Sequence, residues 1–270
     1  MKMYRISIIG AGNVAFRFAL AFQAAGHIIN CVCSRSFDKA DKVVRALKKH
    51  KSDAVAVTDY SLIPESDILV IAVSDSAIAG VAEKVKEIST RFKLVVHTSG
   101  ATEIKVLSDA GISNCGVFYP LMTLSMNKDL DIRMVPFLLE SKSEEGNEIL
   151  SSLATSLKAE YNFYSSQKRL QMHTAAVFAT NFINYMLSMA YDIAHPDFTF
   201  LLPSAIETVR KAFLHTPSKA QTGPALRRDM ETLNKHISLL KERGLEEQAR
   251  MYEILSGGIM EKYRKDKIKF

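Results

Sequence analysis

The chain has 270 residues, of which 47% are hydrophobic and 24% are charged, and it carries a net charge of +6. This composition is typical of a globular protein with a buried core, and it excludes a chain that is disordered along most of its length. Most of the excess positive charge lies in residues 262–270, which predicts a solvated basic tail and argues against nucleic-acid binding.

A glycine-rich turn between an apolar run and a helix-like segment is the first feature of the chain. The apolar run covers residues 6–9, and the turn begins directly after it. A phosphate is bound by exposed backbone N–H groups and by the positive end of a helix dipole, so its site needs a sharp turn without side chains. Gly10 is expected to make the turn, Gly12 to let a pyrophosphate approach the backbone, and Ala15 to keep the helix close to the strand. The cofactor-binding residues predicted here are Gly10, Gly12, Asn13, Val14 and Ala15.

The second apolar run, residues 28–33, ends in Ser34, Arg35 and Ser36. Dinucleotide folds place the group that contacts the adenosine ribose at this point of the chain. An NAD-selective site has a carboxylate there, whereas Arg35 offers a fixed positive charge and a planar donor fork that suit a 2′-phosphate. We therefore predict NADP as the cofactor, bound by Ser34, Arg35 and Ser36. The alternative is that Arg35 faces water at the end of the strand.

Strands and helices are expected to alternate as far as residue 165. Further strands are predicted at 54–57, 67–73, 93–97, 115–119, 134–139 and 160–164, with helices at 38–50 and 144–157. The predicted fold class is α/β, a Rossmann-type doubly wound and mostly parallel sheet followed by an all-α carboxyl-terminal domain. We place the NADP-binding domain at 1–165 and an all-helical domain, for substrate binding and dimerisation, at 166–270.

Two loops that follow predicted strands are expected to border the cofactor, because ligands bind beyond the carboxyl ends of parallel strands. One loop contributes Val73 and Ser74, and the other contributes Thr98, Ser99 and Gly100. The second loop is small and polar, so it can approach a nicotinamide ring. For Ser74 the alternative role is to cap the following helix.

The segment 167–194 is predicted to form a long helix rich in Ala, Phe, Met and Leu, with polar residues that argue against a membrane span. At 100° per residue, Thr180 and Asn184 each lie within about 20° of His173 around the helix axis, and Asn181 lies about 80° away. This polar stripe on an otherwise buried helix is expected to face the cleft. The other faces would be covered by the first domain and by a second subunit.

Three cysteines, Cys31, Cys33 and Cys115, form neither a metal-ligand set nor an even disulfide framework. The first two alternate onto one face of a predicted buried strand. We therefore expect no metal site and a location in the reducing cytoplasm.

Taken together, these motifs resemble a known family. They are Gly10–Ala15, Ser34-Arg35, His97–Ala101, Tyr119-Pro120-Leu121, His173–Asn181, Glu207-Thr208, Gly223-Pro224 and Arg228-Asp229. Over almost its whole length the chain resembles Rossmann-like proteins with an all-helical carboxyl-terminal domain that are labelled NADP oxidoreductases of the deazaflavin-dependent type. It is more distantly similar to pyrroline-5-carboxylate reductase, prephenate dehydrogenase and 3-hydroxyacid dehydrogenases, and its helical domain resembles the carboxyl-terminal domain of 6-phosphogluconate dehydrogenase.

The resemblance implies an oxidoreductase that binds a small-molecule substrate between two domains and forms a homodimer through the helical domain. One branch of the family resembles a ketopantoate reductase, so reduction of a 2-oxo acid is an alternative activity. Many relatives have His-Pro where this chain has Tyr119-Pro120. If that histidine donates a proton in the relatives, the role falls here to Tyr119, to His173 or to no residue.

Hydride transfer to a C=O or C=N carbon requires a proton donor within about 3 Å of the heteroatom. We predict His173 as the general acid, because a histidine ordinarily titrates near neutral pH. Asn181 is expected to hold the substrate, Arg228 to pair with a substrate carboxylate, and Glu207 to be a further substrate contact. For His173, Asn181 and Arg228 the alternative is hydrogen bonding to neighbouring backbone. A non-catalytic NADP(H) sensor is the competing class of function, and it predicts apolar packing at the nicotinamide end.

Overall fold

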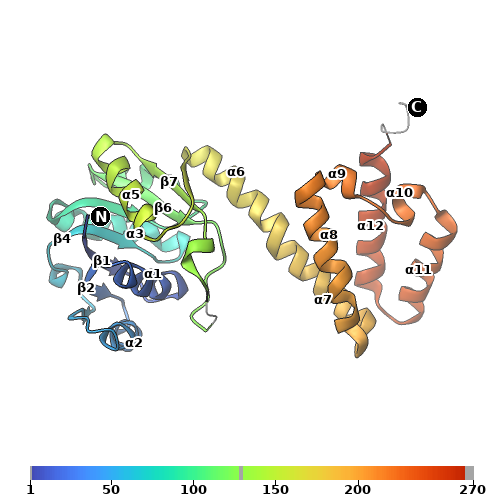
Figure 1. Ribbon diagram of the computed structural model, residues 1–270, viewed down its shortest axis with the longest axis horizontal. Helices are drawn as coiled ribbons and strands as arrows, with labels where there is room; N and C mark the ends of the chain where they lie inside the picture. Colours follow the sequence, from blue (N-terminus) through green and yellow to red (C-terminus); the bar gives the residue numbers. More distant parts are fainter. Residues whose placement is uncertain (1, 128–129, 265–270) are drawn as a thin grey trace. The chain divides into compact units, whose positions relative to one another are not determined.

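The computed structural model of the chain describes residues 2–127 and 130–264. It divides into two compact units, Met1–Asn181 and Phe182–Phe270, which are drawn in Figure 1 and are described here separately. Residues 265–270, which make up most of the predicted basic tail, lie outside the described residues.

The first unit is built on one eight-stranded sheet. Its strands are β1 (Arg5–Ile9), β2 (Ile28–Cys33), β3 (Val55–Val57), β4 (Ser66–Ile71), β5 (Phe92–His97), β6 (Cys115–Pro120), β7 (Phe137–Ser141) and β8 (Tyr161–Phe163). Their order is β3-β2-β1-β4-β5-β6-β7-β8, and all neighbours are parallel except β6 and β7. The order of the strands reverses between β1 and β4, so the predicted doubly wound, mostly parallel Rossmann-type sheet is confirmed.

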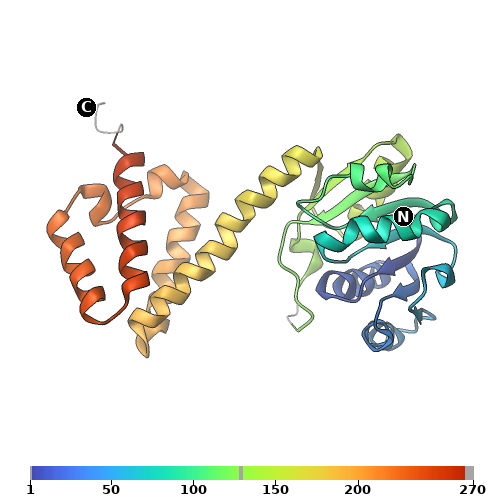
Figure 2. The ribbon, with the colours of Figure 1, turned by 180° about the vertical axis from the view of Figure 1, so that it is seen from behind.

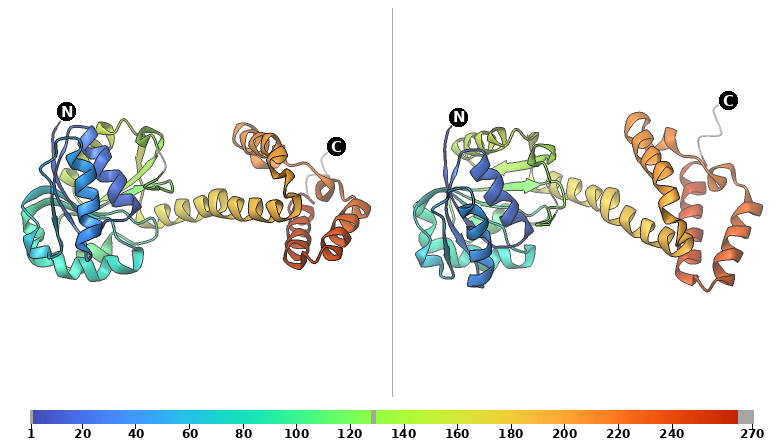
Figure 3. Two further views of the ribbon diagram at one scale, coloured as in Figure 1. Left: turned by 90° about the horizontal axis from the view of Figure 1, so that it is seen from below. Right: turned by 60° about the horizontal axis from the view of Figure 1, so that its bottom comes forward.

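Helices cover both faces of this sheet. The helices of the unit are α1 (Asn13–Ala24), α2 (Phe37–Lys48), α3 (Asp75–Val85), α4 (Lys105–Asp109), α5 (Glu144–Ser156) and α6 (Ser166–Val177), with short 3₁₀ turns η1 (Tyr60–Leu62), η2 (Lys86–Arg91) and η3 (Ile132–Met134). On one face α1, α2 and α5 bury Phe18, Val43 and Leu150, and Figure 3 shows α1 and α2 side by side there. On the other face, seen in Figure 2, α3 and α4 bury Ile78 and Leu107. Each such side chain contributes about 1.5–3 kcal/mol when fully buried, which fixes β1 and β4 between two cores.

Strand β7 begins three residues later than the sequence predicts. Residues 132–134 form the 3₁₀ turn η3 instead, and Asp131 caps this turn by accepting a hydrogen bond from the Arg133 N–H at 3.0 Å. An aspartate that accepts from the backbone two residues on favours a turn over a strand. The strand therefore starts only at Phe137.

The long helix predicted at 167–194 contains a π-helical segment. α6 ends at Val177, the π turn η4 covers Phe178–Phe182, and α7 covers Ile183–Ala194. Strands and helices stop alternating at β8, where the sequence places the domain boundary, whereas the first compact unit extends through α6 to Asn181. A π turn holds more residues than an α turn, so it changes which side chains share a face.

Over its described residues, 182–264, the second unit has helices and no strand. Its elements are α7, η5 (Asp197–Leu201), α8 (Leu202–His215), α9 (Pro217–Ala220), α10 (Pro224–Arg227), α11 (Met230–Glu242) and α12 (Glu246–Lys262). α11 and α12 pack together, and His236 Nδ1 and the Tyr252 hydroxyl are hydrogen-bonded between them at 2.7 Å. Within the described part of the chain, we find no helix whose length and apolarity together suffice to cross a membrane.

Candidate functional site

The glycine turn joins β1 to α1 at the carboxyl edge of the sheet. Gly10 has a φ of +117°, and a Cβ at this position would lie 2.1 Å from the carbonyl oxygen of Ala72 on the neighbouring segment. Gly12 is the N-cap of the 12-residue helix α1, and a Cβ there would meet nothing within 4 Å. The first N–H groups of α1 therefore face open space without a capping side chain. This arrangement fits a pyrophosphate, because helix N-termini and free N–H groups attract anions.

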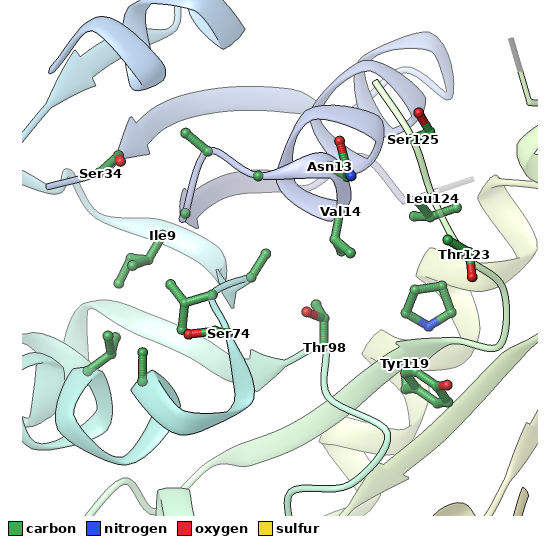
Figure 4. Close-up of a pocket in the computed structure, with 18 of the residues that line it drawn as sticks. Ile9, Asn13, Val14, Ser34, Ser74, Thr98, Tyr119, Thr123, Leu124 and Ser125 are labelled. Atoms are coloured by element: carbon green, nitrogen blue, oxygen red, sulfur yellow. The ribbon is translucent and has the colours of Figure 1, made fainter. Parts of the chain in front are cut away.

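A pocket of about 1170 Å³ extends from this turn and lies wholly in the first unit. In Figure 4, Ser34 lies at one side of the pocket, Thr98 lies near its middle, and Tyr119 and Thr123 lie at the opposite side. Several residues predicted from the sequence line it, namely Gly10, Gly12, Asn13, Val14, Ser34, Arg35, Val73, Ser74, Thr98, Tyr119, His173 and Asn181. The pocket connects all the loops that were predicted to border it, because residues that follow β1, β2, β4, β5 and β6 line it.

The end of the pocket near Ser34 is positively charged. Arg35 follows β2 directly after Ser34, Lys39 lies in the first turn of α2, and both line the pocket. Lys84, on α3, is a further cation that lines the pocket. Neither lysine was predicted from the sequence. Lys39 could have been, because it is a basic residue in the first turn of the helix after β2. Ser36 does not line the pocket, and its hydroxyl accepts a hydrogen bond from Lys39 N–H at 3.4 Å as the N-cap of α2.

Three further residues predicted to bind cofactor lie behind the pocket surface. Ala15 is fully buried in the core under α1, as expected for a residue that packs helix against strand. Ser99 is buried, and its hydroxyl accepts hydrogen bonds from the N–H groups of Ala101 and Thr102 at 3.1 and 2.9 Å. Gly100 supports two pocket side chains, because a Cβ there would lie within 3 Å of both Tyr119 and His173.

Tyr119 and His173 form a hydrogen-bonded pair in the pocket. The Tyr119 hydroxyl lies on β6 and His173 Nδ1 on α6, and the two atoms are 2.8 Å apart. The rings meet edge to face, with centroids 5.7 Å apart and an interplanar angle of 73°. Both side chains are partly buried, and burial raises the pKa of the Tyr119 hydroxyl above its ordinary value. A phenol held in this way can give a proton to a bound molecule while the imidazole supports it.

Thr180 and Asn181, which both lie in the π turn, line the same pocket. The Thr180 hydroxyl lies 2.7 Å from the carbonyl oxygen of Ala176 and 2.9 Å from Asn181 Oδ1, and these two acceptors share its single proton. On a regular α-helix Asn181 would lie about 80° from His173, so the π turn explains why both line one cavity. Asn184, the third member of the predicted stripe, belongs to the second unit. Leu170 of α6 is 45% exposed in the single chain, and its predicted cover by a second subunit stays a prediction.

The loop after β6 closes one side of the pocket and was not predicted as part of the site. Its residues 121–125 all line the cavity, together with Pro120 at the end of β6. Two side chains of α1 hold this loop: Asn13 Oδ1 accepts from Met126 N–H at 3.2 Å, and Arg17 Nε donates to the Ser125 carbonyl at 2.6 Å. Figure 4 shows Asn13 beside Ser125. Asn13 therefore has a structural partner in addition to its predicted place at the cofactor.

The two residues predicted to bind substrate, Arg228 and Glu207, lie in the second unit. Glu207 is paired with Arg210 at 2.8 Å and with Lys211 at 3.4 Å, and these interactions hold its pKa at about 2. Arg228 has a left-handed backbone conformation and donates to the Met260 carbonyl at 3.2 Å. Their substrate roles stay predictions.

These features define a Rossmann-type dinucleotide-binding protein with a hydrogen-bonded tyrosine–histidine pair in its pocket. Residues 5–100 match the family described as NADP oxidoreductase coenzyme F420-dependent, and residues 135–259 match a domain of unknown function, DUF2520. A provisionally named NADP oxidoreductase from Bacteroides fragilis is similar over 96% of this chain and 98% of its own, with 31% identity and a TM-score of 0.83. The chain therefore belongs to this family of NADP oxidoreductases, as the sequence motifs predicted.

More distant solved structures share the fold. Pyrroline carboxylate reductase from Plasmodium falciparum matches 95% of this chain and 99% of its own, at 11% identity and a TM-score of 0.58. Prephenate dehydrogenase from A. aeolicus matches 97% of this chain and 99% of its own, at 14% identity and a TM-score of 0.56. Among curated proteins, no sequence matches the chain. The family membership makes the protein an oxidoreductase with NADP as its cofactor, which answers the choice between enzyme and sensor.

Proposed function

We propose that this oxidoreductase transfers hydride between NADP(H) and a carbonyl or imine carbon of a small molecule bound beside Tyr119 and His173. The observation that carries the proposal is the 2.8 Å hydrogen bond between these two side chains in the cavity that begins at the glycine turn. A sensor that only holds the cofactor has no need of two titratable groups placed together in such a pocket.

In the proposed complex the first N–H groups of α1 hold the pyrophosphate, and Arg35 contacts the 2′-phosphate. Arg35 and Lys39 place two cations near Ser34, and Lys84 is a third cation that lines the pocket. Cations of this kind favour a phosphate dianion. Thr98 lies between Ser34 and Tyr119 in the pocket, which Val73 also lines. This arrangement supports NADP(H) over NAD(H).

NADPH, when bound, supplies the hydride. Negative charge then develops on the substrate heteroatom, and a nearby proton donor stabilises it. The Tyr119 O–H gives its proton to this heteroatom, and the imidazolium of His173 passes its Nδ1 proton to the phenolate oxygen, so the tyrosine is restored. His173 then regains a proton from solvent. Asn181 holds the substrate through its amide group, which also lines the pocket.

The function is tested by following NADPH oxidation with the purified protein and a panel of 2-oxo acids, cyclic imino acids, ketones and an oxidised deazaflavin. We expect at least one of these classes to be reduced by the wild type, and Tyr119→Phe to lose that activity while it still binds NADPH. The proposed reaction would be wrong if no class were reduced, or if Tyr119→Phe were as active as the wild type.

The proposal includes a homodimer, formed through the helical unit, in the cytoplasm. One face of α8 carries Leu202, Ile206, Val209 and Phe213, all of them 42–82% exposed in the single chain. An apolar stripe of this kind is typical of a subunit contact. Light scattering of the purified protein should give the mass of a dimer, and Phe213→Glu should shift it to the monomer. A matched change at an exposed phenylalanine of α2, Phe37→Glu, should leave the mass unchanged.

A further inference from the structure

A buried ion pair fastens the start of α6 to β7. Arg169 is only 1% exposed and pairs with Glu140, whose side chain is 15% exposed. The Glu140 carboxylate also accepts hydrogen bonds from the N–H and the hydroxyl of Ser166, the first residue of α6, at 2.9 and 2.8 Å. A carboxylate is favoured at a helix N-terminus by the helix dipole. Charge and hydrogen bonds together therefore fix the first turn of this helix.

The same network reaches the loop after β5. Arg169 Nη2 donates to the Thr102 carbonyl at 2.5 Å, and Ile104 N–H donates to the Ser166 hydroxyl at 3.0 Å. This loop also contains Gly100, where a Cβ would lie 2.6 Å from Tyr119 Cζ and 2.7 Å from His173 Nδ1. The loop, β6 and α6 are thus closely packed around Gly100.

His173 lies four residues after Arg169 on α6. Residues at this spacing share a face of a helix, so the anchored face of α6 is also the face that meets Tyr119. A rotation of α6 by a single residue would turn His173 by about 100° and break its hydrogen bond. We propose that Arg169 is a positioning residue of this oxidoreductase, whose ion pair with Glu140 holds His173 against Tyr119. This inference rests on the proposed role of the pair as proton donor.

The charge of Arg169 has a second effect on the pair. The titratable groups that face Tyr119 are His173 and Arg169 on α6 and Asp75 on α3. Burial and the Asp75 carboxylate raise the pKa of Tyr119, whereas the Arg169 cation opposes this rise. Tyr119 is a phenolate after it has given up its proton, and a nearby cation favours that form. Arg169 therefore supports proton transfer as well as geometry.

Two variants separate the fork geometry of Arg169 from its charge. Arg169→Lys keeps the positive charge but cannot reach Glu140 and the Thr102 carbonyl with one planar group. The double variant Arg169→Met/Glu140→Leu removes both charges, so no unpaired charge is left buried. Lys93→Gln is the matched control, because it breaks an ion pair with Asp67 in which the lysine side chain is 54% exposed.

The first measurement needs no substrate. We record ring ¹⁵N spectra of His173 in the ligand-free protein, with Tyr119→Phe as the reference for a lost hydrogen bond at Nδ1. Both Arg169 variants are expected to shift the signal toward that reference, and Lys93→Gln is expected to leave it unchanged. A folded Arg169→Lys protein that keeps the wild-type signal would overturn the positioning role.

The second measurement uses turnover with the substrate class identified for the wild type. In both Arg169 variants kcat is expected to fall about 10- to 100-fold, with KM and the NADPH dissociation constant little changed. The double variant should also move the alkaline limb of the kcat profile to higher pH, because the cation that lowers the pKa of Tyr119 is gone. A lower melting temperature with unchanged kcat and pH profile would show a purely structural ion pair. If the wild type reduces nothing, the proposed function fails, and the ¹⁵N spectra still decide the role of Arg169.

Discussion

The Tyr119 hydroxyl and His173 Nδ1 lie 2.8 Å apart, although 54 positions separate the two residues in sequence. β6 and α6 bring them together over Gly100, in a cavity that also contains the glycine turn. From the sequence alone, Tyr119 and His173 were alternative candidates for the proton donor. The structure joins them, so substitution of either one should remove the same step.

Tyr119→Phe and His173→Asn are each expected to lower kcat by about 10²- to 10⁴-fold, the usual contribution of a positioned acid. The double variant should be no slower than the slower single variant, because both groups act in one proton path. The rate of NADPH oxidation in a single turnover compares the chemical step among the three variants directly.

The second unit offers a matched control for that experiment. Tyr252 and His236 form a similar pair, with 2.7 Å between hydroxyl and Nδ1 and an interplanar angle of 84°. Tyr252→Phe should leave kcat unchanged. Losses at Tyr119 and His173 that simply add in the double variant would contradict a shared path.

Arg35→Gln is expected to weaken NADPH binding about 10- to 100-fold and to leave NADH binding nearly unchanged. The reason is that a hydrogen bond to a charged group contributes about 1.5–3 kcal/mol, and only NADPH carries the 2′-phosphate. Calorimetric titration at two salt concentrations gives both affinities and their screening. Arg45→Gln serves as the control, since Arg45 is an exposed arginine of α2 that pairs with Asp41. Equal losses for the two cofactors would argue against recognition of the 2′-phosphate.

The sheet was predictable because local patterns determine it. β4 and β5 are continuous apolar runs, buried on both faces, and they have the positions expected from the sequence within one or two residues. The glycine turn was also predictable, because its conformation requires glycine. Gly10 has a positive φ, and the neighbouring Ala72 carbonyl leaves no room for a Cβ.

The end of the pocket near Tyr119 was less predictable because it depends on contacts between distant segments. The π turn at Phe178–Phe182 has no clear sequence signal, yet it brings Asn181 to the pocket. The loop after β6 has no regular periodicity. Its place is set by a hydrogen bond that Asn13 accepts and one that Arg17 donates, both more than 100 residues earlier in the chain. No local signal in the sequence pointed to Arg169, since its partner Glu140 lies on another element.

Gly100→Ala is expected to lower the free energy of unfolding by about 1–3 kcal/mol and to separate Tyr119 from His173, because the added methyl overlaps both side chains. Gly257→Ala is the matched control, because Gly257 lies within α12 and a Cβ there meets nothing within 4 Å. Alanine at that helix position should stabilise the protein by about 0.5–1 kcal/mol. Urea unfolding of both variants provides the comparison. A Gly100→Ala protein of wild-type stability and activity would show that Tyr119 and His173 can move to make room for the methyl group.

His97 should make the protein less stable at acidic pH. The side chain is fully buried on β5, and its Nδ1 accepts a hydrogen bond from Ser99 N–H at 3.2 Å. Burial, aided by the Arg169 cation, lowers the pKa of His97 to about 3, whereas a histidine in the unfolded chain titrates near 6.5. Between these values the unfolded state binds the extra proton. Above about pH 6.5 His97 therefore has no effect on the pH dependence of stability. From there toward pH 3 it lowers the free energy of unfolding by at most about 1.4 kcal/mol per pH unit.

His97→Asn isolates this contribution from that of His27, whose pKa is also lowered by burial and which acts with the same sign. The asparagine Oδ1 can accept from Ser99 N–H in place of Nδ1, but the side chain does not titrate. Urea unfolding of both proteins at several pH values between 7.5 and 4.5 gives two stability curves. The wild-type curve should fall more steeply, so that any advantage over His97→Asn at pH 7.5 shrinks with each step toward acid. Parallel curves would mean that His97 takes up its proton in the folded protein as readily as in the unfolded chain.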